Sequence, residues 1–262
     1  VPQLRGARQL PLFAVSTTLS AGEFTHFVGL TDEVRKVKDL IIDKRLSARA
    51  VFLDPELTLA TPAWLWSSTG MRSVDHAVEA LQSTNAHPMT DALAIRALGL
   101  LNRFLRECKD DPSDLVARTN AHLGAWMSIN GLANVNLGLS HGIGHQLGAR
   151  CNVPHGVTSC VMLPHVMEFN RDHVGSRQRW IAEALGIETR ALSDRAAADA
   201  AIEGVRSLVR DLGLPSRLSE VGVTRDDFAG IAKDALEDLI VAANPRPVTS
   251  VDDVLGLLEK AF

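Results

Sequence analysis

Histidine is the residue type best able to do chemistry in this sequence, and four of its nine histidines stand close together in the chain. They are His141, His145, His155 and His165. Residues 141 and 145 are one helical turn apart, so on a helix their imidazoles face the same way and can share a metal ion or a substrate. A pair of capping or packed histidines has the same spacing, and a metal site needs a third ligand.

Two features near this pair favour chemistry over packing. Gly142 and Gly144 stand between the two histidines, and each costs a helix interior about 1 kcal/mol relative to alanine, so a close backbone approach is the expected compensation. His155 follows a proline and precedes a glycine, which indicates the start of a helix over 157–169. A histidine at that position lies at the start of the helix, where it is poised for contact rather than buried at random.

A second candidate is His76, inside the helical segment 69–79. Val74, Val78 and Leu81 form the core-facing stripe of this predicted helix. A polar side chain on a mostly apolar helix is often a core residue paired with a neighbour. His76 can therefore be either a functional histidine or a core histidine paired with a neighbour.

The elements that must position these residues are mostly helical. Helix-start signals are Thr61-Pro62, His87-Pro88, Asp111-Pro112, Ser193, Thr224 and Thr249. We expect roughly seven to nine helices after residue 60, and strands and turns over 10–54, with β-forming residues in 12–18 and 50–53. The predicted fold class is mainly α: an incomplete α/β segment, residues 1–56, precedes an all-helical bundle domain, residues 57–262.

The composition is that of a folded protein. With 262 residues, 46% hydrophobic and 22% charged, the chain can bury a core. A formal net charge of -4 gives no electrostatic footprint for nucleic acid or an anionic membrane. Three cysteines are too few for a disulfide scaffold, and no signal peptide or membrane-spanning segment is visible. We expect a cytoplasmic protein that binds small molecules.

Together these motifs resemble the iron-containing (group III) alcohol dehydrogenase family, which includes the maleylacetate reductases and shares its architecture with dehydroquinate synthase. The resemblance extends in order and spacing over residues 10–262. The segments that carry it are 16–18, 22–25, 36–38, 54–57, 69–79, 140–148, 153–156, 163–170 and 244–247.

The resemblance implies an α/β domain that binds a dinucleotide, a helical domain that binds a divalent metal such as Fe or Zn, and a reaction in the cleft between them. It assigns metal-ligand positions to His76, His141 and His155, and it places His145 by the substrate as a proton relay. The residues on the cofactor side are Thr17, Thr18 and Lys38. The implied reaction is hydride transfer between NAD(H) or NADP(H) and a small alcohol or carbonyl, carried out by a homodimer.

Arg72 departs from the family pattern, which has an aspartate ligand one turn before His76. A guanidinium cannot bind a cation, and Asp75 points about 100° away from His76 around the helix. Arg72 therefore argues for a reductase without tightly held metal, in which its charge holds the carbonyl oxygen or an acidic substrate; alternatively, it turns to solvent. The catalytic candidates are His145, Arg72 and His76.

The family's phosphate-binding Gly-Gly-Gly-Ser turn has no counterpart in this sequence. We expect either a fragment of a longer enzyme or a product that has lost its dinucleotide-binding half. The first hypothesis is an NAD(P)-dependent oxidoreductase. The second is a repurposed homologue whose histidine pocket binds a ligand or catalyses a non-redox step without nicotinamide, and the third is an inactive dimerisation partner.

Overall fold

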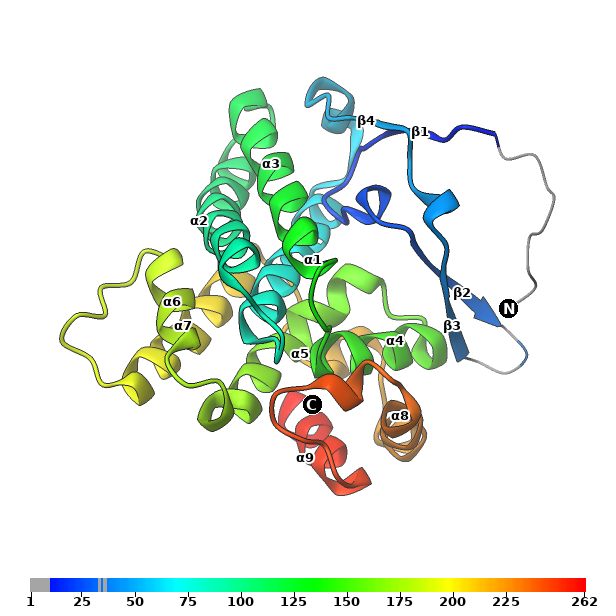
Figure 1. Cartoon of the computed structure of the whole chain (residues 1–262), viewed down its shortest axis with the longest axis vertical. Coiled ribbons are helices and arrows are strands. Elements are labelled where there is room, and N and C mark those ends of the chain that lie inside the picture. The colour runs from blue at the N-terminus through cyan, green and yellow to red at the C-terminus, as the bar shows by residue number, and fades with distance from the viewer. Residues whose placement is uncertain (1–9, 33, 35–36) are drawn as a thin grey trace.

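The described residues of the N-terminal part contain four strands in two separate pairs. The structure is a computed structural model, and it describes residues 10–32, 34 and 37–262. β1 (Phe13–Val15) pairs in parallel with β4 (Ala50–Phe52), and β2 (Phe27–Asp32) pairs antiparallel with β3 (Val37–Ile42). Figure 1 shows these strands along one side of the helices. Both stretches in which the sequence predicts β-structure at this end contain a strand.

Helices dominate the rest of the described chain, so the mainly α fold is confirmed. They are α1 (Ala63–Gln82), α2 (Pro88–Asp110), α3 (Leu115–Leu132), α4 (Leu139–Cys151), α5 (His155–Asn170), α6 (Arg177–Ala184), α7 (Asp194–Asp211), α8 (Arg225–Glu237) and α9 (Val251–Ala261). Within the described residues, none of them combines the length and the apolar character that crossing a bilayer requires. The domain boundary after residue 56 stays a prediction.

Three helix starts lie where the sequence predicts them, because capping is a local interaction. His87 is the N-cap of α2, with Pro88 at the first helical position. Ser193 caps α7, where its hydroxyl accepts a hydrogen bond from the N–H of Ala196 at 3.2 Å. Thr224 forms a capping box at α8.

Three other starts are displaced by a few residues. Ser250 caps α9 in place of Thr249, and its hydroxyl accepts from the backbone N–H three residues on. Asp114 caps α3, whereas Asp111 bonds within the preceding turn. Pro62 is itself the N-cap of α1. At α3 and α9 several capping residues stand together, and local signals do not choose between neighbours.

The apolar core consists of two clusters. The first cluster is formed mainly by α1, α2, α3 and α7, and the second mainly by α4, α8 and α9. α5 belongs to both, since Cys160 and Leu163 face the first cluster while Val161 and Val166 face the second. Because residues on nearly every side of α5 are buried, it is the helix between the two halves.

α5 starts in close contact with α1 at Gly156. A β-carbon there would lie 2.6 Å from the carbonyl oxygen of Ser68, which is backbone and cannot swing aside. We expect Gly156→Ala to lower the free energy of unfolding by about 2 kcal/mol and to displace the neighbouring His155. Urea denaturation measures the first effect.

Gly256→Ala is the matched control, because Gly256 lies inside α9 with no atom within 4 Å of the added methyl. There the better helix propensity of alanine should raise the free energy of unfolding by up to about 1 kcal/mol. Equal effects of the two substitutions would contradict the close packing of α5 on α1.

Candidate active site

Helix α1 carries a run of charged and ionisable side chains through the centre of the protein. Arg72, Asp75, His76 and Glu79 lie within about two turns of it, and all four are buried. Arg72 is only 1% exposed, so the alternative in which its side chain turns to solvent is wrong. Buried charges require partners, and these partners define the site.

Asp75 is the centre of a hydrogen-bond network that joins three helices. Its Oδ2 accepts from the hydroxyl of Ser140 on α4 at 2.8 Å and from that of Ser159 on α5 at 2.6 Å. Arg72 Nη1 donates to the same Ser159 hydroxyl at 3.0 Å and lies 3.4 Å from Asp75 Oδ2. One carboxylate oxygen therefore links α1 to two other helices and balances part of the guanidinium charge.

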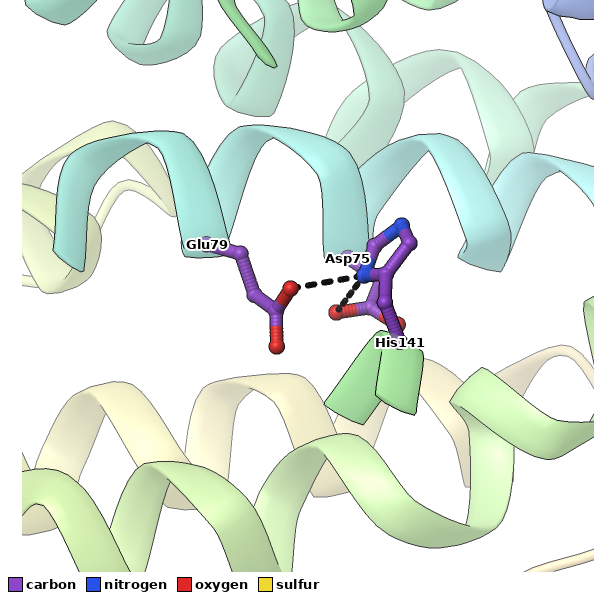
Figure 2. A group of neighbouring side chains, drawn as sticks. All are labelled: Asp75, Glu79 and His141. Carbon is purple, nitrogen blue, oxygen red and sulfur yellow. Dashed lines mark ion pairs between the residues drawn. The ribbon is translucent and has the colours of Figure 1, made fainter. Parts of the chain in front are cut away.

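Glu79 holds the start of α4. Gly138 N and Ser140 N donate to its two carboxylate oxygens, both at 2.8 Å. N–H groups at a helix start have no acceptor within the helix, and Gly138 at the N-cap has no side chain to offer. His141 Nδ1 lies 2.7 Å from Glu79 Oε2 and 3.7 Å from Asp75 Oδ1, and Figure 2 shows these three side chains converging between α1 and α4.

Burial sets the protonation behaviour of this cluster. It raises the pKa of Asp75 to about 7, because desolvation and then the charge of Glu79 disfavour a second carboxylate. Desolvation likewise raises the pKa of Glu79 and lowers that of Arg72. Desolvation, followed by the charges of His141 and Arg72, lowers the pKa of His76 well below its usual value. His76 is therefore a neutral imidazole at neutral pH.

The predicted histidines form two stacked pairs. The rings of His76 and His141 stack with centroids 5.2 Å apart. The rings of His145 and His155 stack with centroids 5.8 Å apart and planes 11° from parallel. His145 Nδ1 also lies 3.6 Å from Oδ2 of Asp238, a residue in the loop after α8 that the sequence did not single out.

The structure gathers a different set of possible ligands from the one that the resemblance implies. Among the described residues, one group of His, Cys, Asp or Glu has all its ligand atoms within 4.8 Å: Asp75, Glu79 and His141. His76 lies beside this group against the ring of His141, and His155 pairs with His145. The sequence contains a signal for the two carboxylates: Asp75 and Glu79 are four residues apart and therefore lie on one face of the helix.

A divalent cation does not fit the position that the resemblance assigns to it. Arg72 stands one turn before His76, and its guanidinium is buried inside the site rather than directed away. Both oxygens of Glu79 and one of Asp75 already accept hydrogen bonds from the protein. The site therefore already contains a positive charge, the guanidinium of Arg72, which is part of the chain and cannot be exchanged for a metal ion.

The predicted cofactor-side residues are Thr17, Thr18 and Lys38. The backbone beside the two threonines is fixed to α1, since Leu19 N donates to Thr69 Oγ1 at 3.1 Å and Leu19 O accepts from Ser73 Oγ at 2.5 Å. Ser73 is the next residue after Arg72, so this segment adjoins the charged cluster. Lys38 lies in β3, and its side chain is outside the described part of the structure.

The sequence of the helical part decides the family. A model of the Fe-containing alcohol dehydrogenase family, C-terminal part, matches residues 67–262. The chain belongs to this family. The NAD-dependent methanol dehydrogenase of Bacillus methanolicus is 37% identical over 254 residues, which cover 97% of this chain and 66% of that relative. The resemblance drawn from the motifs is confirmed.

Solved structures of family members share this architecture. The crystal structure of a 1,3-propanediol oxidoreductase superposes with a TM-score of 0.91 at 36% identity, covering 98% of this chain and 67% of the other. That of the maleylacetate reductase from Agrobacterium tumefaciens superposes with a TM-score of 0.83 at 27% identity, covering 96% and 67%. The chain thus spans about two thirds of the length of the relatives that it matches.

Proposed function

We propose that this chain forms the substrate-binding and catalytic part of an NAD(P)-dependent oxidoreductase that interconverts a small alcohol and its carbonyl. The observation that carries the proposal is the buried Arg72 on α1, inside a cluster that includes the His76–His141 pair and adjoins the segment 17–19. Relatives at 35–41% identity are named as dehydrogenases or reductases of small alcohols and aldehydes. The nicotinamide, when bound, supplies or accepts the hydride.

Arg72 takes the electrostatic role in this proposal. When a carbonyl is reduced, negative charge develops on its oxygen, and a fixed positive donor in a site sheltered from water stabilises that charge. Nε of Arg72 is buried and has no hydrogen-bond acceptor among the described residues, so one donor of the guanidinium is left for a ligand. Neutral His76, one turn further along the same helix, adds a donor or acceptor without repelling Arg72.

His145 takes the proton-transfer role. The alkoxide formed on hydride arrival needs a proton, and alcohol oxidation needs a base for the same proton. His145 is 16% exposed at its side chain, whereas His141 is buried against Glu79, so His145 is the histidine of α4 that can exchange protons with solvent. A homodimer and a cytoplasmic location remain part of the proposal, and light scattering measures the first of these.

Titration of the purified chain with NADH and NADPH tests the proposal. Nucleotide binding should quench tryptophan fluorescence and transfer energy to the nicotinamide; the reporters are Trp64, Trp66, Trp126 and Trp180. We expect saturation at about micromolar to tens of micromolar cofactor. Turnover is then measured with short aldehydes, 1,3-propanediol and maleylacetate.

His145→Gln separates binding from chemistry in this experiment. The substitution should leave cofactor binding within about twofold and lower turnover about 100-fold or more. A chain that binds neither nucleotide up to about 1 mM would contradict nicotinamide binding by this chain on its own and make the non-redox histidine pocket the next function to test.

A further inference from the structure

The two carboxylate oxygens of Asp238 make different contacts, one with its own loop and one with His145. It lies in the loop between α8 and the short 3-10 helix Val241–Ala243. Its Oδ1 accepts a hydrogen bond from the backbone N–H of Ile240 at 2.9 Å, which orients the carboxylate within the loop. Its Oδ2 lies 3.6 Å from Nδ1 of His145. The loop bond therefore aims the second oxygen at the imidazole.

The imidazole of His145 is held on a second side as well. Its ring stacks on that of His155 with planes 11° from parallel, which fixes the plane of the ring. The carboxylate then fixes which ring nitrogen points toward α8. Both groups are mostly buried, with 16% of the His145 side chain and 17% of the Asp238 side chain exposed. The field of a carboxylate in such surroundings is screened much less than that of one at the surface.

The charge of Asp238 persists in this position. Burial acts to raise the pKa of the carboxyl, but the facing His145 side chain and the hydrogen bond from the Ile240 N–H together lower it below its ordinary value. The residue is therefore an anion at neutral pH. A carboxylate has no proton to donate, so it favours a proton on the nitrogen that faces it.

We propose that Asp238 is a positioning residue that holds His145 in the tautomer with the proton on Nδ1, so that Nε2 is the nitrogen that exchanges a proton with the substrate. This rests on the proposed function for its catalytic consequence. In alcohol oxidation, the hydroxyl proton moves to Nε2 and the hydride leaves carbon for the nicotinamide, which is reduced as the alcohol is oxidised. The resulting imidazolium lies beside the carboxylate, which stabilises it. Carbonyl reduction runs the same transfers in reverse.

Asp238→Asn is the decisive variant because it keeps the shape and the acceptor for the Ile240 N–H and removes the charge. Its amide group can also donate, which favours an unprotonated Nδ1 on the facing ring. Asp234→Asn is the matched control: Asp234 lies four residues earlier on α8, and its carboxylate accepts from Arg150 Nε at 2.6 Å, away from His145. Both variants lose one carboxylate from the same region.

The tautomer is measured without substrate or cofactor. Long-range proton–nitrogen correlation spectra of 15N-labelled chain distinguish protonated from unprotonated ring nitrogens, and His145→Gln assigns the resonance. We expect the Nδ1-protonated form of His145 in the natural sequence and in Asp234→Asn, and a shift toward the Nε2-protonated form in Asp238→Asn. An Nε2-protonated His145 in the natural sequence, or no change in Asp238→Asn, would overturn the proposal.

Turnover gives the second readout. We expect Asp238→Asn to lower kcat about 100-fold while KM changes less than about threefold, Asp238→Glu to restore part of kcat, and Asp234→Asn to leave kcat within about twofold. A merely structural role would lower kcat and stability of Asp238→Asn together and leave the tautomer of His145 unchanged. The tautomer can depend on Asp238 while neither the natural sequence nor any variant catalyses a reaction with nicotinamide. In that case the proposed function fails and the positioning role of Asp238 stands.

Discussion

Replacing Arg72 by methionine is expected to lower kcat for carbonyl reduction about 100- to 1000-fold, the size of effect seen when one donor to a developing oxyanion is removed. The substitution removes the buried cation that faces Asp75 and Ser159. Arg72→Lys keeps the charge but not the planar set of donors, so part of the activity should return. Steady-state kinetics with a short aldehyde measure the effect.

Arg103→Met is the control for this series. Arg103 lies on α2 with 68% of its side chain exposed, and its ion pair with Glu107 is at the surface. Its removal should leave kcat within about twofold, because exposed pairs contribute little and this side chain is mostly in solvent. Activity of Arg72→Met within tenfold of the natural sequence would contradict the electrostatic role of Arg72.

Metal content provides a measurement that does not depend on activity. We expect the natural sequence to retain well under one divalent ion per chain after dialysis, and Arg72→Asp to retain about one, because a carboxylate then stands one turn before His76. Elemental analysis by mass spectrometry measures both. A tightly held ion in the natural sequence, lost in Glu79→Gln, would show that the group of Asp75, Glu79 and His141 binds metal despite Arg72.

Removal of the Glu79 side chain is expected to have the largest effect on stability. Glu79→Ala leaves the N–H groups of Gly138 and Ser140 without their acceptor and leaves Arg72 with only Asp75 to balance it. Breaking a buried charge network by removing one partner costs about 3–5 kcal/mol. We expect a loss of that size in the free energy of unfolding, measured by urea denaturation.

Two further variants make this result interpretable. Glu79→Gln keeps an acceptor oxygen and the shape of the side chain, so its loss should be smaller. Glu107→Ala removes an exposed partner from a surface pair and should cost less than about 1 kcal/mol. A loss for Glu79→Ala no greater than that for Glu107→Ala would contradict the role of Glu79 as the acceptor that holds α4.

The parts of the structure that can be predicted from the sequence are those that depend on interactions between residues within about one helical turn of each other. The cap of α7 at Ser193 and the placing of His141 and His145 on one helix depend only on neighbours. The proline before His155 marks the start of α5, which begins two residues before the predicted range 157–169. The family also follows from the sequence, because its motifs keep their order and spacing over most of the chain.

The partners of the site residues could not be predicted, because they come from remote segments. Ser140 and Ser159 reach Asp75 from 65 and 84 residues away, and the sequence assigns a role to neither, although Ser140 begins the segment 140–148. Glu79 lies within a motif recognised at the outset, yet its role appears only when α4 is packed against α1. The pairing of His155 with His145, rather than with the other proposed ligands, likewise depends on tertiary packing.

The position of α5 has a consequence for how the protein loses its structure. Arg72 and His76 are carried by a helix of the first apolar cluster, whereas His141, His145 and Asp238 belong to helices and loops of the second. α5 packs into both, so it is the element that transmits local opening of one half to the other. If the second half opens first on heating, the two sides of the site separate while most helical signal persists. The temperature at which activity is lost then measures the separation of the two halves and not the unfolding of the whole chain.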